Sequence, residues 1–132
     1  MTRRFHWIAL TFVGACVARY GPEPASYPPA NRAAGTIAHI IAERDSIRGE
    51  LLEVRDTALL VLTLDRVLLV RDGAVRSLRF DDLRRREPLS ALSPAERERL
   101  RLLSHFPQGV PTAAFTAILE SRRQSALIVV DK

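Results

Sequence analysis

Residues 47–80 constrain the fold more than any other stretch, because they hold the densest run of leucine and β-branched residues in the chain. Such runs favour strands, and the Asp and Gly residues that interrupt them supply turns. A meander this apolar must close on itself or be covered by other elements. We therefore predict four consecutive antiparallel strands, at Ile47–Arg55, Ala58–Thr63, Val67–Val70 and Ala74–Phe80.

The apolar pattern within this stretch predicts a bend. Apolar and polar residues alternate from Ile47, and the alternation shifts by one place at Leu51-Leu52. A shift in a period of two indicates a β-bulge or a strong bend. Ala58–Leu62 and Val67–Val70 are apolar at every position, so we expect both of their faces to be covered. Leu60 should be a core residue and Glu50 should lie on a wet face.

The segment Thr36–Ser46 has mixed propensities. Its Ala, Glu and Arg suit a helix, whereas Ile37, Ile40 and Ile41 suit a strand. We favour a strand that leads into Ile47, which gives a sheet of five strands. His39 has no second ligand at a suitable spacing, so it is expected to be a packed histidine and not a metal ligand.

A charged connector, 81–92, separates the strands from two predicted helices. We interpret it as a solvated loop. Ser93-Pro94-Ala95-Glu96 then has the form of a capping box with Pro at the first helical position. The first helix should turn Leu100, Leu103 and Phe106 inward and Arg97, Glu98 and Arg101 outward, and it should end at 106–109.

The second helix is predicted from Pro111 or Thr112 to about Arg123, and together the helices should form a hairpin over one side of the sheet. The apolar run 126–130 is expected to pair with the meander as a last strand. The fold class is thus α+β. It consists of a small, strongly bent antiparallel sheet or barrel of about five strands, a C-terminal helical hairpin and a terminal strand.

The N-terminal residues 1–15 have the three parts of an export signal. Arg3 and Arg4 form a charged region, 5–13 an apolar region, and Val13-Gly14-Ala15 a small-residue cleavage site. The apolar run is too short to span a bilayer, which needs about 20 residues. The alternative is a buried N-terminal helix, but the proline-rich stretch that follows would separate such a helix from the domain core.

The single cysteine, Cys16, directly follows this cleavage site. Val13-Gly14-Ala15-Cys16 resembles the lipobox of bacterial lipoproteins, although Leu is commoner in that family at the first position and Ala-Gly commoner than Gly-Ala. The resemblance implies lipidation of Cys16 and anchoring to a bacterial membrane. A lone thiol cannot form an intramolecular disulfide in an exported protein, which also favours lipidation. Cleavage after Ala15 by an ordinary signal peptidase, and a buried structural cysteine, are the alternatives.

Residues 16–35 carry Cys16 and a tether rich in proline, and no apolar period survives in them. Such a composition cannot bury enough surface to fold. The predicted organisation is therefore a signal peptide at 1–15, a lipid-anchored tether at 16–35 and one globular domain at 36–131. Within that domain we expect the β meander at 36–80, the helices at 93–123 and the last strand at 126–130.

The meander resembles the small barrels of Sm-like and SH3-like domains. Ile47-Arg48-Gly49-Glu50-Leu51, then Asp56 and the strand Leu59–Leu62, carry the resemblance, together with 70–75. It covers about 45 residues and implies a small barrel fold. The chain departs from the Sm pattern where RNA would bind, because no Asn follows Asp56, Asp72 separates Arg71 from Gly73, and the stacking aromatics are missing.

No pattern of catalytic, metal-binding or cofactor-binding residues emerges from the sequence. The glycines are scattered, and no Ser-His-Asp order has supporting context. We expect neither enzyme activity nor a cofactor or metal. The formal charge of +5 is too small and too dispersed to indicate a nucleic-acid partner.

The remaining hypothesis is an exported, lipid-anchored module of the cell envelope, facing the periplasm or the cell exterior. It would act without catalysis, touching the membrane through the lipid on Cys16 and binding an envelope protein or an anionic polymer. The alternative is an Sm-like nucleic-acid-binding protein whose N-terminus is not an export signal. Guanidinium groups suit anionic partners. The candidate contacts are Arg76, Arg79, Arg84, Arg85 and Arg86.

Overall fold

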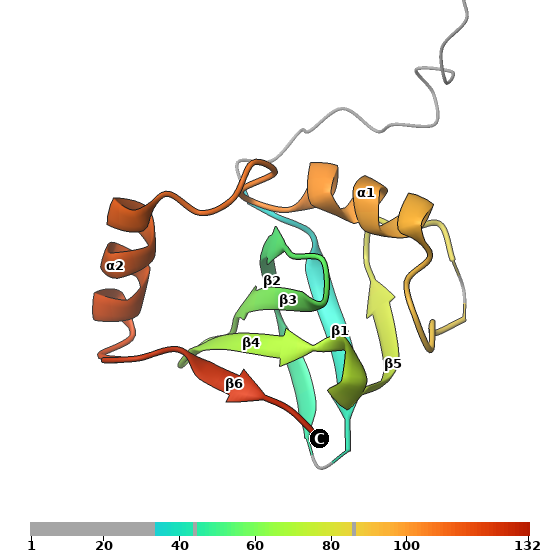
Figure 1. Ribbon diagram of the computed structural model, residues 1–132, viewed down its shortest axis with the longest axis horizontal. Helices are drawn as coiled ribbons and strands as arrows, with labels where there is room; N and C mark the ends of the chain where they lie inside the picture. The colour runs from blue at the N-terminus through green and yellow to red at the C-terminus, as the bar shows by residue number, and fades with distance from the viewer. Residues whose placement is uncertain (1–33, 44, 86) are drawn as a thin grey trace, which may run out of the picture.

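The computed structural model of the protein describes residues 34–43, 45–85 and 87–132, which form one mixed sheet and two α-helices (Figure 1). The order of strands in the sheet is β5-β1-β2-β3-β4-β6. A short 3-10 turn, Asp72–Ala74, lies between β4 and β5. The strands are β1 (Ile37–Ala42), β2 (Ser46–Val54), β3 (Ala58–Leu62), β4 (Val67–Arg71), β5 (Val75–Phe80) and β6 (Ile128–Val130), and the helices are α1 (Pro94–Leu103) and α2 (Thr112–Ser121).

The predicted meander is confirmed except at its last strand, β5, which does not pair with β4. β1, β2, β3 and β4 pair in sequence as antiparallel neighbours, and β5 returns to pair with β1 on its other side. Within the segment 36–46, residues Ile37–Ala42 form the favoured strand, which lies between β2 and β5 in the sheet. The terminal run also forms a strand, but β6 is parallel to β4, so the sheet is mixed and not antiparallel throughout.

The sheet is not closed into a barrel, so the barrel form of the prediction is wrong. Closure would require the two edge strands to pair, and β5 and β6 lie at opposite ends of the strand order. β6 has only three residues, all paired with the middle of β4, and extends the sheet by a short ribbon. The curvature remains strong because the predicted bulge is present, with a register shift between Leu51 and Glu53 of β2.

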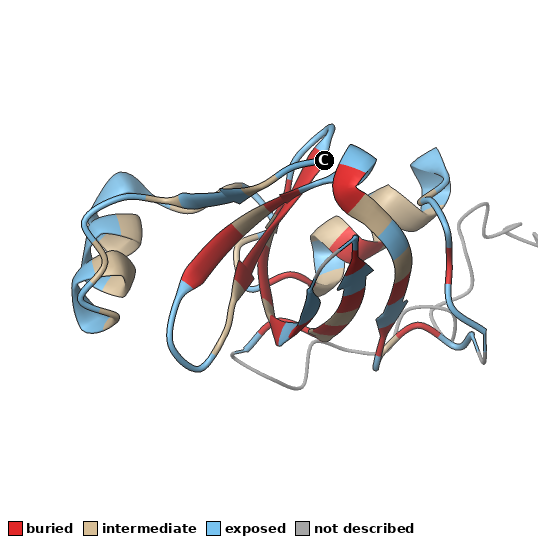
Figure 2. Ribbon diagram, turned by 90° about the horizontal axis from the view of Figure 1, so that it is seen from below, coloured by how far each residue is buried: buried red, intermediate tan, exposed pale blue. Residues whose placement is uncertain are grey.

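Both faces of β3 are buried, as the unbroken apolar run predicted. Leu59 and Val61 belong to the main core, which also takes Leu100 from α1. Leu60 belongs to a smaller core that Phe115 and other partly buried residues of α2 cover. Figure 2 shows that α2 is nowhere fully buried and stands at one side of the sheet.

Helix α1 begins as predicted. Ser93 caps the helix, accepting from the Glu96 backbone while the Glu96 carboxylate accepts from the Ser93 backbone. The Ser93 backbone N–H and the Ser93 hydroxyl both donate to the Glu96 carboxylate and, aided by the Arg85 guanidinium, lower the pKa of Glu96. Arg97 was expected to point outward and does not. Its guanidinium donates to the Arg55 carbonyl at 2.7 Å and also binds Asp72, so it fixes α1 to the sheet.

The expected hairpin of helices is not confirmed, because Figure 1 shows α1 and α2 on different sides of the sheet. The backbone N–H groups of His105 and Phe106 donate to the Leu51 and Leu52 carbonyls, each at 2.9 Å. The linker between the helices is thereby held on the bulged part of β2. The chain leaves this point towards the second face of the sheet, where α2 packs.

The connector 81–92 is not simply a solvated loop. Leu83 and Leu89 are buried in the main core. Leu89 exchanges two backbone hydrogen bonds with Leu78 of β5, at 2.7 and 2.8 Å. The connector therefore covers part of the outer edge of β5.

Candidate functional site

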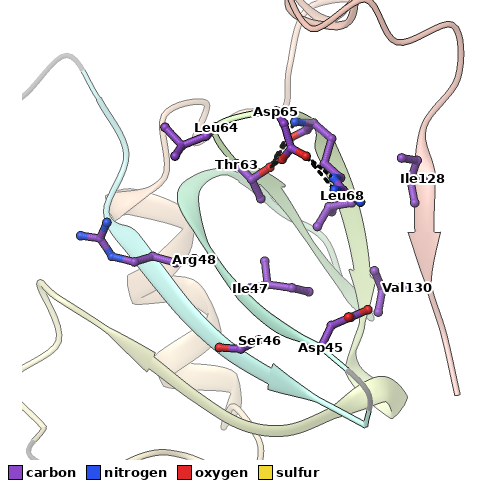
Figure 3. Close-up of a pocket in the computed structure, with 11 residues that line it drawn as sticks. Asp45, Ser46, Ile47, Arg48, Thr63, Leu64, Asp65, Leu68, Ile128 and Val130 are labelled. Carbon is purple, nitrogen blue, oxygen red and sulfur yellow. Dashed lines mark hydrogen bonds and ion pairs between the residues drawn. The ribbon is translucent and has the colours of Figure 1, made fainter.

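A groove of about 340 Å³ opens at the end of the curved sheet (Figure 3). It lies between the β1–β2 connection, the β3–β4 turn and β6. Its apolar lining comes from Ile47 and Leu68, which are buried core residues, and from Ile128 and Val130 of β6. The groove is therefore an extension of the main core to the surface, produced because the sheet stays open at this end.

The pairing of β4 with β6 forms the wall of this groove that is exposed to solvent. Leu68 pairs with Ile128 and Val70 with Val130, so the apolar side chains of β6 continue the inner surface of β4. Ile128 is 42% exposed, although Leu68 beside it is only 6% exposed. Solvent thus reaches apolar surface where a further strand would normally cover it.

A second groove of about 330 Å³ follows β6 on towards the β1–β2 connection. Val129 and Asp131 line it together with Ala42, Glu43 and Asp45 from the far wall. Val129 is 47% exposed. The exposed apolar surface of β6 is therefore bordered by open space along the strand.

The two edges of the sheet differ. The edge at β5 is partly covered by the connector through Leu89, as described above. In the part of the chain that the structure describes, β6 pairs with β4 alone, so its other edge has no strand beside it. An uncovered edge presents backbone donors and acceptors that can pair with another extended chain.

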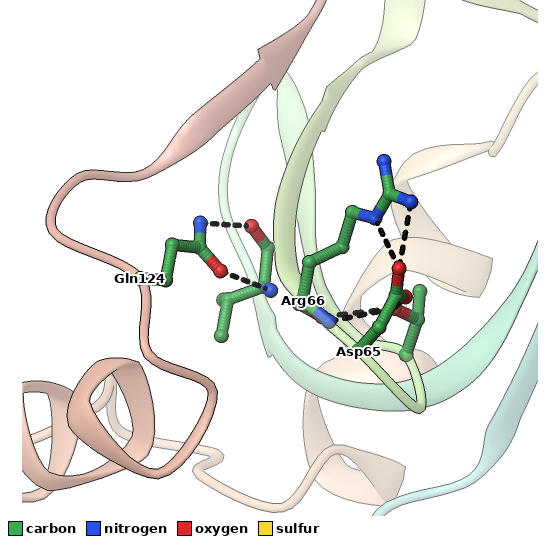
Figure 4. Close-up of polar contacts among 5 residues, drawn as sticks. Asp65, Arg66 and Gln124 are labelled. Atoms are coloured by element: carbon green, nitrogen blue, oxygen red, sulfur yellow. Dashed lines mark hydrogen bonds and ion pairs between the residues drawn. The ribbon is translucent and has the colours of Figure 1, made fainter.

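The β3–β4 turn forms one border of the groove, and its charged side chains pair with each other. Arg66 donates to Asp65 through Nε at 2.9 Å and Nη2 at 2.6 Å, and the Thr63 hydroxyl donates to the same carboxylate at 2.8 Å (Figure 4). The Arg66 bond, followed by the Thr63 bond, lowers the pKa of Asp65 to about 2. Leu64 at the tip is 96% exposed.

Gln124 holds the segment before β6 against β4. Its Oε1 accepts from the Val67 N–H at 2.8 Å and its Nε2 donates to the Val67 carbonyl at 2.9 Å (Figure 4). The side-chain amide thus occupies the place of a backbone peptide in the ladder, one residue before the β4–β6 pairing begins at Leu68. Nothing in the sequence distinguished Gln124 from a solvated glutamine.

The residues of the predicted arginine cluster do not share one environment. Arg76 lies 3.8 Å from Glu43 and Arg85 lies 2.6 Å from Glu96. Arg79 and Arg84 are exposed and pair with none of the described acidic residues. Arg86 and Cys16 lie outside the described residues.

Each histidine of the domain is bound to a carboxylate. The distance from His39 Nε2 to Asp81 Oδ1 is 3.0 Å. His105 Nδ1 lies 2.6 Å from Glu50 Oε1, which also accepts from the Gly35 N–H at 2.8 Å. Glu50 was predicted to be a free wet-face residue, and instead it links the start of the domain to the turn after α1.

Among the residues that the structure describes, no group of three or more His, Cys, Asp or Glu side chains could hold a metal ion. None of the helices in that part of the chain is long and apolar enough to cross a membrane.

No protein-family model, no curated protein sequence and no solved structure matches the chain.

Proposed function

We propose that this chain is an exported lipoprotein of the bacterial cell envelope whose domain binds a protein partner without catalysis. Held at a membrane through lipid on Cys16, the domain would reach its partner across the tether of residues 16–35. The lipobox-like Val13-Gly14-Ala15-Cys16 supports the anchor. The first strand, β1, begins at Ile37, close after the tether, which supports the division into anchor, spacer and binding domain.

The observation that carries the binding role is the contrast between the two edges of the sheet. Stable domains cover or charge their edge strands, and the connector covers part of β5. β6 instead presents Ile128 and Val129 to solvent beside two grooves. We infer that the partner supplies an extended segment that pairs with β6 and places apolar side chains in the grooves, as in β-strand addition.

A photo-crosslinking residue at position 129 of the full chain tests this role in living cells. It should yield an adduct with a particular envelope protein, identified by mass spectrometry. Ile128→Lys in the same chain should reduce the adduct at least tenfold, because Lys opposes pairing at an edge. The control is Leu102→Lys, which changes a leucine of α1 that is 52% exposed. An adduct that Ile128→Lys leaves unchanged, or one formed only between copies of this chain, contradicts the proposed partner.

Anchoring is tested by the intact mass of protein extracted from membranes. We expect a chain that begins at Cys16 and carries two or three acyl groups, since a single acyl chain binds a bilayer only marginally. Cys16→Ser should leave the chain unprocessed or soluble. An unmodified Cys16 would remove the anchor from the proposal and leave the β6 edge to be tested separately.

The alternative function is nucleic-acid binding by an Sm-like protein whose N-terminus is not an export signal. The bulged β2 and the consecutive antiparallel strands β1 to β4 are the features that this alternative rests on, although the sheet is not closed into a barrel. Single-stranded RNA is bound largely by stacking on exposed aromatic side chains. Phe80, the single aromatic residue of the described strands, is 2% exposed. This burial favours the protein-binding proposal over the alternative.

A further inference from the structure

The outward face of β5, β1 and β2 carries a row of basic side chains that meets the first groove only at Arg48. The buried residues of these strands alternate with it: Ala38 and Ile40 in β1, and Leu78 in β5, point into the core. Residues between them must point to the opposite face. That face carries Arg79, His39 and Arg48, which we call the 79–39–48 row.

Strand pairing brings these residues together. His39 pairs with Arg79 of β5 on one side and with Arg48 of β2 on the other. Paired residues on one face of a sheet lie side by side, and two strand spacings separate the two arginines by roughly 10 Å. Flexible guanidinium groups at that spacing can converge over the histidine on one tetrahedral anion. Figure 3 shows the Arg48 side chain extending away from the groove, consistent with this outward face.

The acidic and basic side chains of this face differ in whether they have partners. Its two carboxylates, Asp81 and Glu50, are held by His39 at 3.0 Å and by His105 at 2.6 Å. The two arginines of the row form no ion pair or side-chain hydrogen bond with any other residue that the structure describes. The two carboxylates thus have histidine partners, and the guanidinium groups can contact an external anion.

The next position of the sheet adds an apolar and a hydroxyl component. Ile41 is 52% exposed and pairs with Ser46 on β2 and Ser77 on β5. An exposed isoleucine between two hydroxyls, beside two arginines, suits the boundary between headgroups and acyl chains. A free phosphate ion would make no use of the isoleucine.

We propose that the 79–39–48 row binds the phosphate groups of anionic membrane lipids, with Ile41 entering the headgroup layer. The phosphate contacts follow from the geometry of the row, whereas a lipid source for them rests on the proposed membrane anchoring. The row shares Arg79 with the arginine cluster expected from the sequence. It replaces the connector arginines with residues from two other strands.

The test measures modification of each arginine by phenylglyoxal with peptide mass spectrometry. The full chain is placed in nanodiscs of phosphatidylcholine, with or without phosphatidylglycerol. Each arginine near an anionic surface contributes enough for about a fivefold effect. We therefore expect Arg48 and Arg79 to react about fivefold more slowly on the anionic discs, with the protection lost at high salt, while Arg66 keeps one rate.

Paired variants separate the row from general positive charge. Arg48→Gln with Arg79→Gln should abolish the preference of the chain for anionic over neutral discs. Arg84→Gln with Arg123→Gln removes the same charge from exposed arginines elsewhere and should preserve that preference. Far-UV circular dichroism of both variants checks that they fold. A preference that both pairs reduce equally would overturn the assignment to the row.

Three further arms distinguish the sources of phosphate, each with the full chain in non-ionic detergent. Soluble short-chain phosphatidylglycerol should protect the row even if the chain proves not to be anchored, so failure of anchoring and failure of the row are distinguishable. Equal protection by inorganic phosphate at the same concentration would overturn the lipid source. Protection by a single-stranded RNA oligonucleotide, but by neither lipid form, would assign the row to nucleic acid and overturn the proposal.

Discussion

Leu60→Ala tests the assignment of the smaller core beneath α2. Leu60 is fully buried there, on the face of β3 opposite to Leu59. At about 0.8 kcal/mol per buried methylene, loss of most of the leucine side chain removes roughly 2–2.5 kcal/mol of transfer free energy. Any cavity left unfilled adds to this cost, and measured Leu→Ala changes reach about 5 kcal/mol.

Truncation of Leu59 in the main core and of Leu60 in the smaller core should leave cavities of different size. Leu59 lies between strands and α1, in a core whose residues are buried on every side. Leu60 faces α2, which has no fully buried residue and can settle into the space. We therefore expect a cost of about 2–3 kcal/mol for Leu60→Ala and about 4–5 kcal/mol for Leu59→Ala.

Urea unfolding of the full chain in non-ionic detergent, followed by far-UV circular dichroism, measures these differences. Leu64→Ala is the matched control, because Leu64 is 96% exposed and its loss should change the unfolding free energy by less than about 0.5 kcal/mol. Equal costs for Leu60→Ala and Leu64→Ala would show that the smaller core does not exist. A larger cost at Leu60 than at Leu59 would contradict the expectation that α2 settles into the cavity.

Three other substitutions test single contacts. Gln124→Ala should cost about 1–3 kcal/mol, because it leaves both backbone groups of Val67 without their partner, and hydrogen exchange should show faster opening of β4 than of β1. Glu50→Ala should lower the free energy of unfolding in urea by about 1–2 kcal/mol, because it leaves the Gly35 N–H without its acceptor. A change near zero would instead support Glu50 as a solvated residue without a structural role. The lowered pKa of Glu96 means that its stabilising effect is present above the ordinary pKa of glutamate and is lost as pH falls through the lowered value. Glu96→Gln should therefore destabilise the chain at neutral pH and become neutral in acid, and a difference that does not depend on pH would exclude the charged cap.

The strands and helix starts could be predicted because local signals specify them. Periodicity placed the four strands β2 to β5 within one residue of their observed bounds, and the shift at Leu51-Leu52 located the bulge. Ser93 and Glu96 specified the start of α1 through contacts three residues apart. These features depend on side chains and backbone within a few residues of each other, so the sequence contains all the information they need.

The candidate sites could be predicted only in part. The arginine cluster was expected along the chain at 76–86, whereas the structure groups Arg79 with His39 and Arg48 through the pairing of three strands. The terminal strand was foreseen, but not its parallel direction or its open edge. No periodicity reveals which strand lies between which others, because sheet order depends on contacts between residues far apart in the sequence.

Local patterns along the chain specify the positions of β2 to β5, the bulge, the helix cap and the apolar run of β6. The tertiary structure decided that the sheet remains open, that α1 and α2 cover different faces, and that Arg97, Glu50 and Gln124 make structural contacts. Periodicity indicates which side chains of a strand or helix face the core and which face solvent. Closure of a sheet and the partner of a polar group depend on distances between separate elements. Those distances are fixed only when the bulge in β2 and the linker bound to it at His105 and Phe106 set the directions of the elements around them.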